Sequence, residues 1–227
     1  MARTIFLIYL GIVPVLVLAE TDSTSFSYAD VLQEVEQRRT HLAQAYAEGS
    51  AEVRDSILWE AEAYLAAVLI ESVFPAWYGT PWDFNGMTRT PGEGAIACGY
   101  FITNVLTDVG FRIPRIRWAQ SASEVFIREL CPVVKRFSGR PLEEVQAHLL
   151  ASGDGVYLVG LDNHTGFLTV ALGEIRFVHA DYYGWDTGVE SEEIFGDNPL
   201  ADSRYRVVGK LFSEEMVVKW LTGVAYE

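Results

Sequence analysis

The chain has 227 residues, of which 50% are hydrophobic and 21% charged, so it contains enough apolar material to bury a full core. Its 31 acidic residues outnumber the 17 basic ones and give a formal charge of -14. Such a charge repels the phosphates of nucleic acids and the anionic surfaces of membranes. We therefore expect no nucleic-acid partner and no stable association with a membrane.

The amino terminus carries a targeting signal. Arg3 gives a short positive start, and an apolar run from Ile5 to Leu18 follows it, too short for a comfortable membrane span. A polar stretch begins at Glu20, directly after Ala19. We interpret residues 1–19 as a secretion signal and expect a secreted or periplasmic protein that starts at Glu20. An uncleaved amino-terminal anchor is the alternative.

Two amphipathic helices are expected after the signal. Apolar residues recur at helical spacing from Tyr28 to Tyr46 and again from Val53 to Leu69, and Gly49 and Ser50 separate the two runs. This pattern predicts a helical hairpin over residues 28 to about 74. We assign residues 20–75 to a helical extension and residues 76–227 to the main domain.

The main domain begins with a loop and continues with helices. Prolines, glycines and aromatic residues, Trp82 and Asn85 among them, fill the stretch from Pro75 to Gly94. An apolar helical face then starts near Cys98 and ends before Gly110. Two further helices are expected over residues 121–131 and 141–150.

Strand patterns dominate the carboxyl-terminal part. Short apolar runs cover residues 155–161, 166–172 and 175–180, with polar turns between them, and a further run covers 205–212. Ser213 then begins a last helix. Closely spaced strands that come after a group of helices predict an α+β fold with an antiparallel sheet.

Cys98 is placed where a nucleophilic thiol is useful. It comes after a glycine-rich loop and opens an expected helix, whose amino terminus favours a thiolate and offers free backbone N–H groups to an oxyanion. His164 and His179 both lie at strand edges. In a hairpin built from strands 166–172 and 175–180 the two histidines would approach each other. One could then act as a base and the other could orient it.

Two other uses of these residues stay open. In an exported protein the two cysteines, Cys98 and Cys131, could form a structural disulfide. A zinc site built from Cys98, His164, His179 and Asp181 is also chemically possible, although the short ligand spacing typical of zinc sites is lacking.

The order of several short segments resembles that of the NlpC-type cell-wall peptidases, a papain-like family. The segments are FNG at 84–86, ACGYF at 97–101, GFRIPR at 110–115 with Gln120, SGDGVYLVGLDNHTGFLTV at 152–170 and GEIRFVHA at 173–180. The family usually has Asp-Cys-Ser-Gly around its nucleophile, whereas this chain has Ala97-Cys98-Gly99-Tyr100. The stretch between Arg115 and Gly153 is long for the family.

The resemblance implies a papain-like fold, in which the helix that carries the nucleophile packs on an antiparallel sheet. It implies Cys98 as the nucleophile, His164 as the base and His179 as the third residue, with Asp181 as the alternative third residue. Trp82, Asn85 and Asp181 are the expected substrate-binding residues, although Tyr78 competes with Trp82.

The implied activity is hydrolysis of amide bonds in peptidoglycan stem peptides through a thioester, with no metal or organic cofactor. The partner is then peptidoglycan or another peptide substrate. An acyl transferase with transglutaminase-like activity uses the same thioester and is one alternative. A non-catalytic binding module on the same fold is the other.

Overall fold

The computed structural model describes residues 27–183 and 187–227. The secretion signal predicted for residues 1–19 lies outside the described residues. Among the residues that are described, no helix combines the length and the apolar character needed to cross a membrane.

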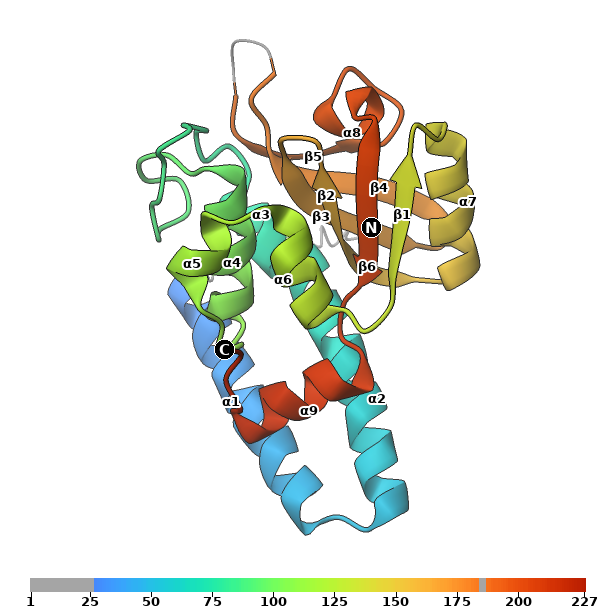
Figure 1. Ribbon diagram of the computed structural model, residues 1–227. Helices are drawn as coiled ribbons and strands as arrows, with labels where there is room; N and C mark the ends of the chain where they lie inside the picture. Colours follow the sequence, from blue (N-terminus) through green and yellow to red (C-terminus); the bar gives the residue numbers. More distant parts are fainter. Residues whose placement is uncertain (1–26, 184–186) are drawn as a thin grey trace, which may run out of the picture.

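The predicted helical hairpin is present as α1 (Tyr28–Glu48) and α2 (Ala51–Val68) (Figure 1). Ser27 and Asp30 form a capping box at the start of α1. Helix α2 runs on into a π-helical turn, η1 (Leu69–Val73), and then into α3 (Phe74–Trp77). The wider turn precedes Pro75, whose missing N–H cannot make the regular helical hydrogen bond. Helix α9 (Glu214–Thr222) contacts both α1 and α2.

The strands form one antiparallel sheet, which confirms the expected α+β class. Its strand order is β1-β6-β2-β3-β4-β5, and each neighbouring pair is antiparallel. The bounds are β1 (Val134–Ser138), β2 (Gly155–Leu161), β3 (Thr165–Ala171), β4 (Glu174–Ala180), β5 (Val189–Glu193) and β6 (Tyr205–Lys210).

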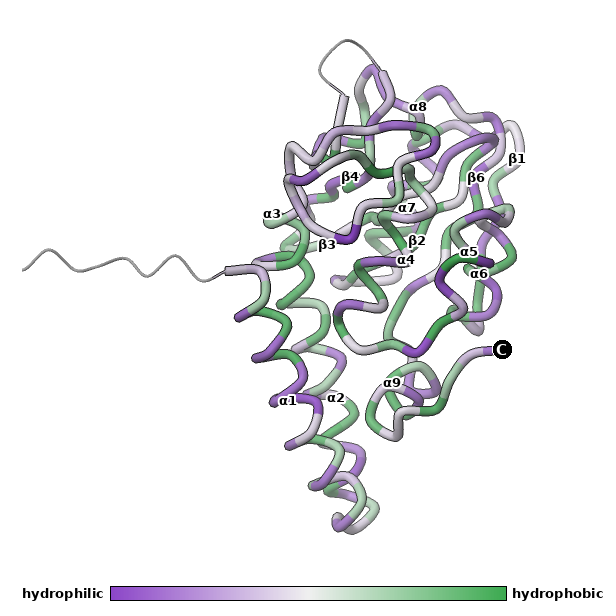
Figure 2. Tube along the Cα trace, turned by 90° about the vertical axis from the view of Figure 1, so that its left-hand side faces the viewer, coloured by the Kyte–Doolittle hydropathy of each residue, from purple (hydrophilic) through white to green (hydrophobic). Residues whose placement is uncertain are grey.

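Helices cover both faces of this sheet. Val156 and Leu158 of β2 belong to the apolar cluster that includes α4 (Cys98–Asp108) and α6 (Ser123–Leu130). Tyr157 and Val159 belong to a second cluster, together with α7 (Leu142–Ser152) and α8 (Pro199–Asp202). Because side chains alternate along a strand, β2 is apolar on both faces. In Figure 2, β2 is coloured as mainly hydrophobic, whereas the amphipathic α1 alternates between hydrophilic and hydrophobic colours.

Several short elements have no recognisable pattern in the sequence and were not predicted. They are the edge strands β1 and β5, the short helix α5 (Arg115–Ala119), and α8. Both edge strands have mostly polar sequences, VKRFS and VESEE, because they pair with a neighbour on one side and have exposed positions. Two of the missed elements adjoin the predicted site residues: β5 pairs with β4, which carries His179, and α5 packs against the start of α4, which carries Cys98.

Candidate active site

Cys98 is the first residue of α4, as the sequence predicts. The next residue, Gly99, packs tightly against α5: a Cβ atom built on Gly99 would lie 2.2 Å from the carbonyl oxygen of Ala119. A serine at this position would therefore require the backbone of α5 to move. Close packing of α4 on α5 accounts for the glycine that comes after the cysteine in this chain.

The two histidines meet, which confirms the predicted approach. His164 directly precedes β3 and His179 lies in β4, and His164 Nε2 is 3.0 Å from His179 Nδ1. The two residues are 4% and 0% exposed, respectively. Since Nε2 of His164 is bonded to His179, Nδ1 is the ring nitrogen left to accept a proton from a nucleophile.

The ring of His179 is fixed from several sides. Phe177 stacks on it, with the ring centroids 4.0 Å apart and an angle of 15° between the planes. Gly166 lies against its Cβ, where a side chain would clash. On the far side of the ring, Nε2 is 2.7 Å from Oε1 of Glu192 in β5. Glu192 was not predicted as a site residue, because the glutamates around it in the sequence are typical of a solvated loop.

The site thus contains a thiol at a helix start and two buried histidines, the second of which is bonded to a carboxylate. Comparisons with family models, curated proteins and solved structures found no match. The chemistry of the site is therefore inferred from its own contacts, burial and charges.

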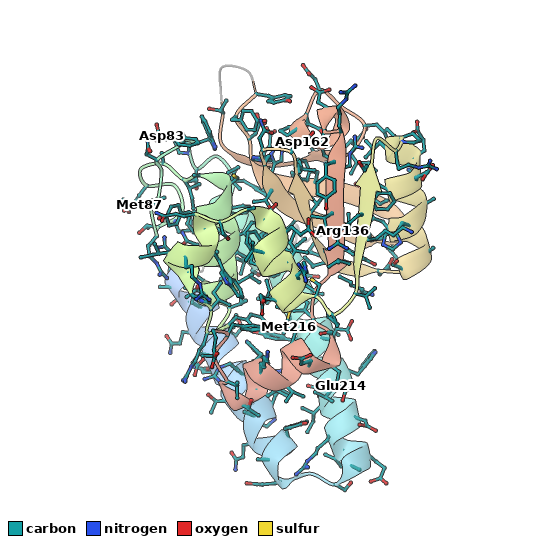
Figure 3. All side chains as sticks on the ribbon, viewed as in Figure 1. Asp83, Met87, Arg136, Asp162, Glu214 and Met216 are labelled. Atoms are coloured by element: carbon teal, nitrogen blue, oxygen red, sulfur yellow. The ribbon has the colours of Figure 1, made fainter. Side chains whose placement is uncertain are left out.

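Cys98 and His164 line two adjoining cavities. The larger cavity, about 660 Å³, has a largely aromatic wall that contains Trp82, Phe84, Met87, Tyr100 and Tyr182. The smaller cavity, about 480 Å³, has a mixed wall, in which apolar residues such as Phe126 and Leu161 lie beside the polar residues Ser121, Ser123, Glu124, Asp162 and Tyr205. In Figure 3, Met87 of the larger cavity lies on the loop before α4, whereas Asp162 of the smaller cavity lies near the sheet. We name them the aromatic cavity and the polar cavity.

Two of the three expected substrate-binding residues line a cavity at Cys98, and the third does not. Trp82 and Asn85 line the aromatic cavity. The ring of Trp82 packs against Tyr182 at a centroid distance of 5.6 Å, and Tyr182 in turn lies 5.1 Å from the ring of His164. Asp181 is buried and belongs to neither cavity wall. Its position gives it no access to a substrate in either cavity.

Burial favours the neutral forms of both Cys98 and His164. It raises the pKa of the Cys98 thiol above its ordinary value, although the backbone amides of Gly99, Thr165 and Cys98 itself oppose the shift. Burial, together with the repulsion between the two rings when both are protonated, holds the pKa of His164 well below its ordinary value. Among the described residues, no hydrogen bond joins the sulfur to the His164 ring, and such contacts often tighten only when substrate binds. Both shifts favour a neutral thiol beside a neutral imidazole, whereas the helix start alone favours a thiolate.

The shifted pKa values of Cys98 and His164 predict how the rate of Cys98 alkylation by iodoacetamide depends on pH. Only the thiolate reacts, so the rate at Cys98 should stay low at pH 5 to 6 and rise through a midpoint above about 8.5, the ordinary value for a cysteine. Peptide mapping by mass spectrometry would follow Cys98 separately from Cys131. A rate that is already at its plateau near pH 6 would instead indicate a thiolate-imidazolium pair and contradict the prediction.

Cys131 is also a free thiol, and it is buried. Burial raises its pKa to about 12, and its side chain packs against Gly209 in β6. It lines neither of the two cavities at Cys98. Cys131 therefore serves as a packing residue beside the sheet.

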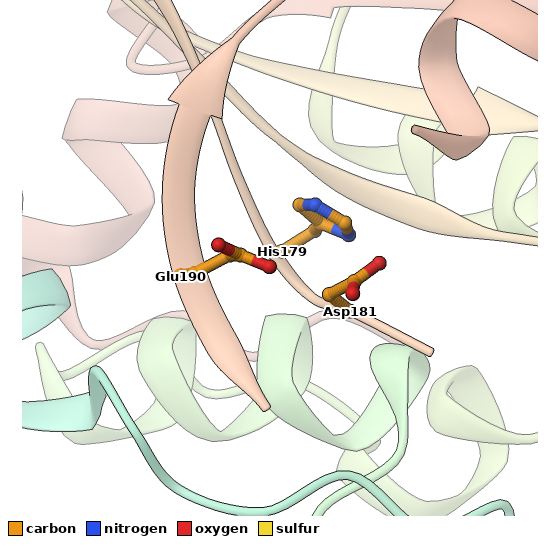
Figure 4. A group of neighbouring side chains, drawn as sticks. All are labelled: His179, Asp181 and Glu190. Atoms are coloured by element: carbon orange, nitrogen blue, oxygen red, sulfur yellow. The ribbon is translucent and has the colours of Figure 1, made fainter. Parts of the chain in front are cut away.

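A group of possible metal ligands lies next to the histidines. His179, Asp181 and Glu190 present ligand atoms that all lie within 4.8 Å of one another (Figure 4). Cys98 and His164, which the zinc alternative requires, do not belong to this group. Both nitrogens of His179 are already bonded, one to His164 and one to Glu192. An ion at this position would have to break one of those bonds.

Proposed function

We propose that the chain is a cysteine hydrolase of the papain-like type, with Cys98 as the nucleophile, His164 as the base and His179 as the residue that orients the base. One observation carries this proposal: the thiol at the start of α4 shares its cavities with a buried histidine whose far nitrogen is bonded to a second histidine. A nucleophile, a base and an orienting group are the three parts that covalent catalysis requires.

The first half of the reaction forms a thioester. The sulfur of Cys98 attacks the carbonyl carbon of an amide while its proton passes to Nδ1 of His164. The backbone N–H groups at the start of α4, which have no partner within the helix, donate hydrogen bonds to the developing oxyanion and stabilise it. The imidazolium of His164 then gives its proton to the leaving amine as the C–N bond breaks.

The second half of the reaction releases the acid. His164 takes a proton from a water molecule, the hydroxide attacks the thioester, and the proton returns to the departing sulfur. No step requires a metal or an organic cofactor. The starting state, a neutral thiol beside a neutral imidazole, is regenerated at the end.

Peptidoglycan stem peptides are the proposed substrate class. The motif order that resembles the NlpC-type peptidases supports this choice, and so does a nucleophile that lies between two cavities. A peptide that extends on both sides of its scissile bond could occupy the aromatic cavity with one part and the polar cavity with the other. The predicted signal at residues 1–19 would bring the protein to the compartment that holds this substrate.

Acyl transfer to an amine is the second candidate, and the polar cavity favours it. Hydrogen bonds from Tyr205 and Arg136 lower the pKa of Glu124, which keeps this carboxyl group ionised in the wall. Asp162 adds a second carboxylate to the same wall. Such a wall suits a cationic amine, which could intercept the thioester in place of water.

Digestion of purified peptidoglycan, with mass spectrometry of the fragments, tests the proposal. Hydrolysis should yield new free carboxyl groups, whereas transfer in the presence of an added diamine should yield amine adducts. The Cys98→Ala variant is the control and should give neither product. Intact peptidoglycan and intact stem peptides after prolonged incubation would favour a non-catalytic binding module.

The assignment of His179 as the third catalytic residue predicts that His179→Ala loses more activity than Asp181→Ala. His179→Ala should lower kcat/KM by about 100-fold and leave a measurable remainder, because a residue that orients the base contributes less than the base itself. Asp181→Ala should have a smaller effect, since Asp181 makes no hydrogen bond to His164. Steady-state kinetics on a stem-peptide substrate would compare them. A silent His179→Ala beside an inactive Asp181→Ala would reassign the third position.

A further inference from the structure

The hydrogen bonds at the two histidines form one continuous series that ends at Glu192. His164 Nε2 is 3.0 Å from His179 Nδ1, and His179 Nε2 is 2.7 Å from Glu192 Oε1. Both histidines are buried, while the Glu192 side chain is 25% exposed and keeps some contact with solvent. The series therefore runs from the buried base to a carboxylate near the surface.

The chemistry of the end group determines the direction of every bond in the series. An ionised carboxylate can only accept, so His179 donates its Nε2 proton to Glu192. A neutral His179 then has an unprotonated Nδ1, which accepts the Nε2 proton of His164. A neutral His164 is consequently unprotonated at Nδ1, the nitrogen that must take the proton from Cys98.

We propose that Glu192 is a positioning residue that fixes the tautomers of both His179 and His164, so that Nδ1 of His164 is free to act as the base. The role of His164 Nδ1 as the base rests on the proposed function, whereas the assignment of the tautomers does not. Glu192 touches neither cavity wall and acts through the two histidines. It therefore differs from Cys98 and His164, which line both cavities, and resembles His179, which lines neither.

The sheet register explains why a residue of β5 can do this. His179 of β4 pairs directly with Glu190 of β5, and Glu192 lies two residues farther along on the same face. Glu192 reaches the ring edge of His179 from this diagonal position, whereas Glu190 approaches Asp181. Two glutamates on one face of an edge strand thus have different partners.

A competing arrangement exists and makes the inference testable. His179 could be an imidazolium that donates to Glu192 and also to His164 Nε2, since the carboxyl groups of Asp181 and Glu190 lie close to it. His164 would then carry its proton on Nδ1 and could not accept one from Cys98. The two arrangements differ in which ring nitrogens are protonated, and they share the same distances between heavy atoms.

NMR of the full chain labelled with 15N-histidine separates the two arrangements without any substrate. Single variants His164→Ala and His179→Ala assign the resonances among the four histidines of the chain. At neutral pH we expect both His164 and His179 as neutral rings with the proton on Nε2. Glu192→Ala should abolish this fixed pattern at His179, and Glu192→Gln should retain it, because an amide carbonyl can accept the same bond.

Steady-state kinetics of the Glu192 variants provide a second, independent test. Glu192→Ala should lower kcat/KM by about 100-fold, while Glu192→Gln should recover most of the loss. Glu193→Gln is the matched control, because its exposed side chain lies on the neighbouring position of β5, and it should leave both spectrum and rate unchanged.

A wild-type spectrum with His164 protonated on Nδ1, or unchanged tautomers in Glu192→Ala, would overturn the inference. These outcomes are distinct from failure of the proposed function. If peptidoglycan stays intact while both rings show the expected tautomers, the hydrolase proposal fails and the role of Glu192 in setting the histidines stands. If the wild-type protein cleaves its substrate with His164 protonated on Nδ1, the reverse holds.

Discussion

Replacing Cys98 by serine is expected to lower kcat on a stem-peptide substrate by about 1,000-fold or more. A serine hydroxyl has a much higher pKa than a thiol, and His164, whose pKa is held low by burial, is a weak base for removing its proton. The neutral thiol already requires His164 to accept its proton during attack, so the loss falls on the chemical step. Steady-state and single-turnover kinetics would both report it.

Cys131→Ser is the matched control for this variant. Cys131 is buried and packs beside Gly209, away from both cavities at Cys98. Its replacement should leave kcat/KM close to the wild-type value, although the free energy of unfolding should fall because a buried hydroxyl replaces a sulfur. Substantial activity in Cys98→Ser, with a correctly folded protein, would remove Cys98 from the role of nucleophile.

The parts of the site that could be predicted from the sequence are those carried by local patterns. The helical repeat on either side of Gly49 predicts the hairpin, and the glycine-rich loop before Cys98 predicts a helix that opens at the cysteine. The meeting of His164 and His179 results from a short hairpin of two apolar strands. In each case the signal lies within a few residues of the element that it describes.

The parts that could not be predicted depend on contacts between distant segments. Glu192 lies in an edge strand whose polar sequence gives no strand signal, and its role depends on pairing with β4. The raised pKa of Cys98 depends on burial of its sulfur, which is a property of the folded chain and not of the local sequence. A helix amino terminus alone suggests a thiolate, but burial has the larger effect on the pKa in this site.

Replacing His164 by alanine is expected to be nearly as damaging as replacing Cys98, with a loss of about 1,000-fold in kcat/KM. His164 is the group with a free ring nitrogen on the cavity wall beside the thiol, and its removal leaves the sulfur with a raised pKa and no proton acceptor. The variant should therefore recover rate at alkaline pH, where solvent can remove the proton, and the profile of kcat/KM should rise steadily with pH.

Exogenous imidazole tests the role of His164 directly. The alanine variant leaves a space the size of a ring beside Cys98, and added imidazole should occupy it and restore part of the activity in proportion to its concentration. His148→Ala and His41→Ala are the controls, because neither side chain lines the cavities at Cys98, and they should show neither the loss nor the rescue. A His164→Ala variant with wild-type kinetics would contradict the hydrolase proposal itself, because no other histidine of the described chain borders these cavities.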